Sequence, residues 1–205
     1  GGGENHVQLD LGDPVELGRG IEAIRQKLPN GRLDALVNNA AIFIAIQRHP
    51  FYEISAEEWD RVSAVNIKGT FLCAKAVFPQ MKEQKSGKII NVSSVRGLRA
   101  TLWGGNEGYS ASKGAVDMMT RALASEWAPH NINVNAIAPL LIRTPLAAPT
   151  LNDPEKLRTY VANVPFKRIG EPQDLAGLCV FLAAPASDFI TGQIIYLDGG
   201  LTAAG

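Results

Sequence analysis

Two residues, Tyr109 and Lys113, have types and a spacing that could carry proton-transfer chemistry. The residues after them have the apolar periodicity of a helix, and on a helix two residues four apart leave the same face, one turn from each other. A phenol alone titrates at about pH 10. An ammonium group beside it favours the phenolate and lowers that pKa toward the range in which a general acid or base works. A surface Tyr–Lys pair without a function has the same spacing, so the pair alone leaves both interpretations open.

The elements that would hold this pair are strands and helices in alternation. Asp13 followed by Pro14 is typical of a helix N-terminus, and Ser55 with Glu58 forms the capping-box signature of another helix. Apolar periodicity and turn residues place the other elements. The predicted strands are 6–11, 33–37, 88–92, 132–138 and 193–197, and the predicted helices are 14–28, 56–85, 109–128, a short one that begins at 153–154, and 172–182.

Strands that alternate with helices and are apolar on both faces indicate an α/β fold, with a parallel sheet covered on both sides. Ligands of such sheets bind beyond the carboxyl ends of the strands. Polar residues follow several predicted strands at that edge: Asp10, Asn38, Asn39, Ser93, Ser94 and the turn 139–144. Each is an ordinary turn former by itself. Their joint placement ahead of the Tyr–Lys helix is what favours a binding site.

Composition narrows the class of protein. The 205 residues are 46% hydrophobic, which fits one globular domain, and 20 basic residues balance 20 acidic ones. This balance argues against nucleic acid or an anionic membrane as a partner. The sequence lacks an apolar run of spanning length and a signal-type leader, so we expect a cytoplasmic protein. Its three histidines lack metal-ligand spacing, and it contains neither a Gly-x-Ser-x-Gly elbow nor a P-loop. We therefore expect no metal, no serine hydrolase and no P-loop NTPase.

Taken together, the motifs resemble those of the short-chain dehydrogenase/reductase family of the common NAD(P)-dependent type. The similarity extends over nearly the whole chain, and the motifs stand in the family's order. The resemblance implies a single Rossmann-type domain, 1–205, built on a three-layer, doubly wound parallel sheet. The matching stretches are 9–11 (LDL), 38–40 (NNA), 65–67 (VNI), 91–94 (NVSS), 109–113 (YSASK), 133–139 (NVNAIAP), 142–144 (IRT), 192–193 (GQ) and 198–200 (DGG).

The resemblance implies a catalytic role for four residues. Tyr109 would be the general acid/base that exchanges a proton with the substrate oxygen, and Ser94, rather than Ser93, would hydrogen-bond that oxygen. Lys113 would bind the nicotinamide ribose and lower the pKa of Tyr109. Asn66 would hold a water that links Lys113 to solvent in a proton relay. For Asn66 the ordinary alternative is a helix-interior amide bonded to its neighbours.

The resemblance also implies NAD or NADP as the cofactor and a small hydroxyl or carbonyl compound as the substrate. Asp10 would contact the adenine, Asn38 and Ala40 the adenine ribose, and Ile142 and Thr144 the carboxamide and phosphate ends. The predicted cofactor-binding residues are Asp10, Leu11, Asn38, Ala40, Tyr109, Lys113, Pro139, Ile142 and Thr144. The predicted substrate-binding residues are Ser94, Arg96, Trp103 and Tyr109, although an ordinary loop face explains Arg96 and Trp103 equally well.

The sequence departs from the family's pattern in three places. Ala41 and Leu140 stand where glycine is usual, and Leu140 is strained if its turn needs a positive φ. The Gly-rich turn that seats the pyrophosphate is absent from the sequence. We therefore expect the domain to be partial, N-terminally incomplete and without the first two strands of the family's sheet. The residue that selects NAD or NADP would belong to that unit.

Two functions from different classes stay open. The first is an oxidoreductase that interconverts a secondary alcohol and a ketone on a sugar acid, polyol, steroid or 3-oxoacyl-type substrate. The second is a truncated, catalytically silent subunit or binding module. Family members usually assemble through the two long helices, here 56–85 and 109–128, and the last strand, so we expect a homodimer or homotetramer. Burial of these helices against the protein's own sheet explains their apolar content equally well.

Overall fold

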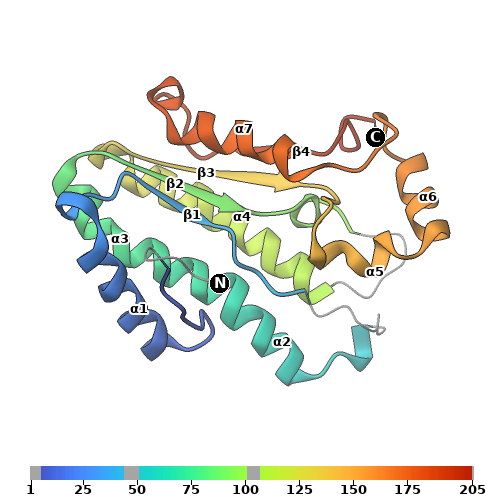
Figure 1. Cartoon of the computed structure of the whole chain (residues 1–205), viewed down its shortest axis with the longest axis horizontal. Helices are drawn as coiled ribbons and strands as arrows, with labels where there is room; N and C mark the ends of the chain where they lie inside the picture. Colours follow the sequence, from blue (N-terminus) through green and yellow to red (C-terminus); the bar gives the residue numbers. More distant parts are fainter. Residues whose placement is uncertain (1–5, 44–50, 101–106, 205) are drawn as a thin grey trace.

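The computed structural model describes residues 6–43, 51–100 and 107–204 (Figure 1). In these residues four parallel strands form one sheet in the order β1-β2-β3-β4. The strands are β1 (Ala35–Asn38), β2 (Gly87–Val92), β3 (Ile132–Pro139) and β4 (Ile194–Leu197). Because all four strands are parallel, their carboxyl ends meet at one edge of the sheet.

Helices cover both faces of the sheet, as predicted for a doubly wound α/β fold (Figure 1). On one face α3 (Thr70–Gln84) and α4 (Glu107–Trp127) pack on β2 and β3, with Met81, Trp127 and Ile89 in the shared core. On the other face α7 (Pro172–Ala183) packs through Leu182 against Ile90 of β2. Ile89 and Ile90 thus point to opposite faces, because side chains alternate along a strand.

The predicted helix starts are confirmed. The Asp13 carboxylate accepts hydrogen bonds from the main chain of Val15 and Glu16 at the start of α1 (Pro14–Lys27), which packs on α3. Ser55 and Glu58 form the predicted capping box of α2 (Ala56–Val62). The helix expected over 56–85 continues without a break to Gln84, but its middle, η3 (Ser63–Gly69), is π-helical.

Short elements connect the layers. In Figure 1 α5 (Ala148–Leu151) and α6 (Pro154–Ala162) lie beyond the end of the sheet to which the arrowheads point. The remaining short helical turns are η1 (Pro29–Gly31), η2 (Phe51–Glu53), η4 (Val95–Gly97), η5 (Ala128–His130), η6 (Pro145–Ala147) and η7 (Pro185–Ser187).

The strand predicted at 6–11 is wrong, because residues 6–10 form no strand in the structure. A strand needs a neighbour for its main-chain hydrogen bonds, and within the described residues β1 pairs only with β2. Leu9 instead packs against Gly20 of α1, and the main-chain N–H of Asp10 donates to Glu16 Oε2 at 3.1 Å. At this edge of the sheet Val37 is 45% exposed.

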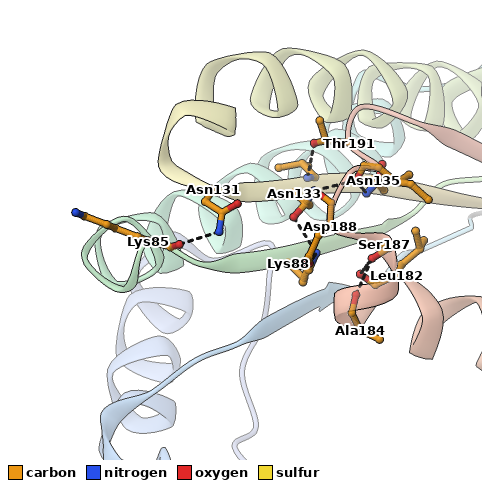
Figure 2. A network of polar contacts seen from close by, with 12 residues as sticks. Lys85, Lys88, Asn131, Asn133, Asn135, Leu182, Ala184, Ser187, Asp188 and Thr191 are labelled. Carbon is orange, nitrogen blue, oxygen red and sulfur yellow. Dashed lines mark hydrogen bonds and ion pairs between the residues drawn. The ribbon is translucent and has the colours of Figure 1, made fainter.

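A polar network fastens the connection between α7 and β4 to the start of β2 and β3 (Figure 2). Lys88 Nζ donates to Asp188 Oδ1 at 2.6 Å and to Asn133 Oδ1 at 2.9 Å. Asn133 Nδ2 in turn donates to the main-chain oxygens of Asp188 and Ile190, and Asn135 Nδ2 also donates to Ile190. These bonds satisfy amides that β3 would otherwise bury without partners, at the end of the sheet opposite the candidate site.

The contact between η4 and α4 leaves no room for a side chain at Gly97. A Cβ there would lie 2.5 Å from Asp117 Oδ2 and 3.0 Å from the main-chain carbon and oxygen of Lys113. We therefore expect Gly97→Ala to lower the free energy of unfolding by about 1–3 kcal/mol, as overpacking does. Gly114→Ala is the matched control, since its Cβ would lie 3.6 Å from Gly97 O and the helix gains about 1 kcal/mol of propensity.

Urea denaturation of both variants measures this difference. Equal midpoints for the two variants would contradict the packing described for Gly97.

Candidate active site

The site is a pocket of about 670 Å³ at the carboxyl edge of the sheet. Tyr109 and Lys113, from the first turns of α4, line it together with Ser94, the second residue after the end of β2. The structure also brings the predicted residues Arg96, Pro139, Ile142 and Thr144 to this pocket. A pocket of this size accommodates a small organic ligand.

The two serines after β2 have different partners. Ser94 Oγ accepts a hydrogen bond from the main-chain N–H of Arg96 at 3.2 Å and lies 3.5 Å from Pro139 O. Ser93 Oγ donates to the main-chain oxygen of Lys113 at 3.3 Å. Both serines line the pocket, but only Ser94 has a side-chain hydrogen bond with Tyr109, whereas Ser93 attaches α4 to the end of β2.

Burial raises the pKa of the Tyr109 phenol. The Ser94 hydroxyl and the positive charge of Arg96 act in the opposite direction but do not outweigh burial, and Tyr160 adds to the rise. This direction is opposite to the one expected from an ammonium neighbour alone. The raised pKa keeps the phenol protonated at neutral pH. The ring of Tyr109 is held edge-on by Phe43, with centroids 4.9 Å apart.

Lys113 is a buried cation, only 3% exposed. Its Nζ donates to Val92 O at 2.7 Å and lies 5.6 Å from the centroid of the Tyr109 ring. Burial lowers the pKa of Lys113 from 10.5 to about 8, and the negative charge of Asp117 partly offsets this effect. Lys113 therefore holds its proton weakly for a lysine, in contact with the pocket.

Asn66 lies in the π-helical segment and is fully buried. Its amide accepts a hydrogen bond from Ile42 N and donates to Ile42 O and to Ser112 Oγ, at 2.9–3.0 Å. Both amide protons are used, and the main-chain oxygen of Asn66 accepts from Thr70 Oγ1 at 2.9 Å. The side chain thus clamps the segment after β1 to α4, and the water relay stays a prediction.

Sequence reasoning missed Asp117, which follows Lys113 by one turn of α4. It is buried, and among the described residues its Oδ1 has no hydrogen-bond partner. Burial raises the pKa of this carboxyl, whereas the hydroxyl of Ser93 and the charges of Arg121 and Lys113 lower it. The i, i+4 spacing from Lys113 was the signal that could have found it.

A second pocket of about 340 Å³ is lined in part by residues 40–42 of the segment that follows β1. The predicted residues Asp10, Leu11 and Ala40 line it, and Ala41 lines both pockets. Asn38 lines neither pocket; its Nδ2 donates to Asn91 Oδ1 at 2.9 Å. Trp103 lies outside the described residues.

The departures from glycine at 41 and 140 have different consequences. Leu140 is not among the described residues with a positive φ, so the strain considered for its turn is absent. Ala41 lines both pockets.

The mouth of the larger pocket includes side chains that the sequence did not point to. Lys156 and Tyr160 of α6 and Leu146 and Thr150 line it. They lie 30 to 50 residues after the Tyr–Lys motif, in a segment with no motif of its own. Only the folding of this segment over the strand ends brings them to the site.

Neither a membrane-spanning helix nor a metal-binding cluster is found in the described part of the chain. No helix there is both long and apolar enough to cross a membrane. No group of three or more His, Cys, Asp and Glu side chains there is placed to hold a metal ion.

The fold and site define a Rossmann-type α/β protein with a tyrosine–lysine pair facing a ligand pocket at the strand ends. The family described as "Enoyl-(Acyl carrier protein) reductase" matches residues 1–202. The 5-keto-D-gluconate 5-reductase of Escherichia coli (strain K12) is 40% identical over 191 residues, 92% of this chain and 72% of that protein. The 3-oxoacyl-[acyl-carrier-protein] reductase FabG of Thermotoga maritima is 41% identical over 194 residues, 94% of this chain and 75% of that protein.

Solved structures agree with these matches. A gluconate 5-dehydrogenase from Burkholderia cenocepacia J2315, in complex with NADP and tartrate, superposes with a TM-score of 0.89 at 34% identity. The superposition covers 96% of this chain and 74% of that one. The chain belongs to the short-chain dehydrogenase/reductase family of NAD(P)-dependent oxidoreductases.

The depressed pKa of Lys113 predicts a stability profile with a definite sign. Between about pH 8 and 10.5 the unfolded chain holds this proton and the folded protein does not, so this group makes folding more favourable as pH rises through that window. Below it, the folded state bears the cost of a buried charge, at most about 3 kcal/mol. We expect Lys113→Met at pH 7 to be as stable as the parent or more stable, even with Val92 O left without its donor.

The matched control is Lys88→Met, which leaves Asn133 Oδ1 without its buried donor and should lose about 1–3 kcal/mol. Urea midpoints at pH 7 and 9.5 measure both variants. A Lys113→Met protein that is clearly less stable at pH 7 would show that this lysine is retained for folding.

Proposed function

We propose that this protein interconverts a secondary alcohol and a ketone, with Tyr109 as the general acid/base. The observation that supports the proposal most strongly is that Tyr109, Lys113 and Ser94 line one pocket from two elements fixed to each other. Such a group can hold a carbonyl oxygen and move a proton to it.

In the reduction direction each residue has a defined task. The Ser94 hydroxyl orients the substrate oxygen, and the neutral phenol of Tyr109 donates its proton to that oxygen as negative charge develops there. The raised pKa leaves the phenol of Tyr109 protonated and able to donate at neutral pH, although it also makes this phenol a weaker acid than a free tyrosine. In the reverse direction the same atoms take the proton back. The bound nicotinamide cofactor supplies or accepts the hydride.

The pockets fit an elongated cofactor in part. Tyr109, Lys113, Pro139, Ile142 and Thr144 would hold its nicotinamide end in the larger pocket, with the Lys113 ammonium near the ribose. Asp10, Leu11 and Ala40 would hold the adenosine end in the smaller pocket, with Asn38 bordering the segment between them. Ala41 lines both pockets, which is consistent with one extended ligand that occupies the two. We propose NAD or NADP without choosing between them.

Assembly and location complete the proposal. Phe71 of α3 and Met118 of α4 are exposed, at 43% and 61%, on the helices predicted to form the interface. We propose a cytoplasmic homodimer or homotetramer that uses these helices.

Replacement of Tyr109 tests the mechanism. We expect Tyr109→Phe to lower kcat by about 10²- to 10⁴-fold, the usual contribution of a general acid or base, because only the transferable proton is removed. The affinity for NAD(P)H, followed by its fluorescence, should change little. Tyr160→Phe is the matched control, since it also removes a phenolic hydroxyl from the pocket but from outside the proposed relay. A Tyr109→Phe protein with the parent's kcat would refute the role of Tyr109.

A catalytically silent subunit or binding module is the second candidate. The observation in its favour is that no glycine of the described residues lines either pocket, so no Gly-rich turn is seen to seat the pyrophosphate.

Titration with NADH and NADPH separates the two candidates. We expect at least one of them to bind this chain with a dissociation constant between about 1 μM and 1 mM, the usual range of Michaelis constants. Lys113→Met should weaken that binding, because it removes the ammonium from the ribose end. No fluorescence change up to millimolar cofactor would favour the silent subunit.

A further inference from the structure

The larger pocket has an uneven distribution of charge. Three cationic side chains line it, from three different elements: Arg96 of η4, Lys113 of α4 and Lys156 of α6. The described lining contains no aspartate or glutamate. A partly enclosed site with charges of one sign attracts ligands of the opposite sign.

Lys113 is an unsuitable anchor for a substrate anion. Its ammonium is almost fully buried and is bonded to Val92 O, and the proposed function assigns it to the cofactor ribose. The anion must then be bound by one or both of the other two cations.

Arg96 is fixed close to the reacting atoms. Its main-chain N–H donates to Ser94 Oγ, and its Nη1 donates to Ala100 O at 3.1 Å. Its charge also lowers the pKa of Tyr109, so it acts on the phenol at short range. Within the described residues Arg96 takes part in no ion pair. Its guanidinium is therefore not neutralised there, and it presents donors in the planar arrangement that matches a carboxylate.

Lys156 stands at the pocket mouth in an exposed ion pair. Its Nζ lies 2.9 Å from Asp153 Oδ2, with the two side chains 61% and 36% exposed. Exposed pairs of this kind contribute little to stability. Asp153 does not line the pocket, and its carboxylate is also bonded to the main-chain N–H groups of Glu155 and Lys156. Lys156 can therefore turn to a ligand at little cost.

We propose that the substrate is a hydroxy acid or keto acid whose carboxylate is bound by Arg96, with Lys156 as a second cation at the pocket mouth. The proposal rests on the proposed alcohol–ketone chemistry of the same site. Arg96 and Ser94 line the same pocket, so one small molecule can place its reacting carbon at Ser94 and its carboxylate at Arg96. Among the substrate classes left open by the sequence, this favours a sugar acid over a polyol or a steroid. A cofactor phosphate is the other anion that these cations could bind.

Equilibrium binding to the cofactor-saturated protein tests the proposal without requiring turnover. The probes are matched pairs, D-gluconate with D-gluconamide and 5-keto-D-gluconate with its methyl ester, measured by calorimetry. We expect each acid to bind about 10- to 100-fold more tightly than its neutral partner, the range given by a hydrogen-bonded charged group. Arg96→Gln should abolish this difference and leave the neutral partner's affinity unchanged. Lys156→Gln should reduce it by a smaller factor.

Arg99→Gln is the matched control, because Arg99 lies on the same segment but does not line the pocket; its Nη1 donates to Leu201 O. The Arg99→Gln protein should prefer acids over their neutral partners by the same factor as the parent. Two results would overturn the proposal: no preference for acids in the parent, or equal losses of affinity for the acid and its neutral partner in Arg96→Gln. A loss of NAD(P)H affinity in Arg96→Gln would also overturn it, because it would assign this cation to the cofactor phosphate. Acids that bind through Arg96 but are never oxidised or reduced would refute the proposed function and leave the carboxylate site standing.

Discussion

The burial of one ammonium group, that of Lys113, is the constraint on which the site depends. Its hydrogen bond to Val92 O joins the first turns of α4 to the last residue of β2, and the Ser93 hydroxyl joins the same two elements from the other direction. Gly97 permits the close contact that completes this attachment. Because α4 is fixed in this way, Tyr109, one turn earlier, faces the pocket beside Ser94. The orientation of the Tyr109 phenol thus depends on the buried ammonium of Lys113, although burial of that charge lowers the stability of the fold.

The buried polar groups at the opposite end of the sheet differ from those at the pocket in their hydrogen bonding. Asn133 and Asn135 lie on a fully buried strand, yet their amides are bonded to the connection before β4. At the site, in contrast, one oxygen of Asp117 has no partner among the described residues. Tyr109, Lys113 and Asp117 all have pKa values moved by burial. Shifted pKa values at one edge of the sheet are typical of a catalytic site.

The sequence predicted the parts of this structure that depend on local chemistry. The caps at Asp13 and Ser55 use side chains within three residues of the main-chain groups they bond, and β2 and β3 are apolar runs that turn residues delimit. The strand at 6–11 failed because a strand also needs a neighbour, which no local pattern supplies. The π-helical turn around Asn66 and the approach of Lys156 to the pocket were likewise beyond local reasoning. Both are set by packing between segments far apart in the sequence.

The two pockets differ in the hydrogen bonds and packing contacts that hold their lining residues in place. The larger one rests on β2, β3 and α4, whose side chains are buried and bonded across elements. The smaller one rests on residues 8–11, which lack sheet hydrogen bonds. Asp10 is held by hydrogen bonds with Gly12 and Glu16, and the Leu9 side chain packs against Gly20. A site is as precise as the elements that hold it. The proposed proton transfer therefore involves side chains that hydrogen bonds between β2 and α4 hold in place, whereas the proposed adenosine end would bind beside a segment without sheet hydrogen bonds.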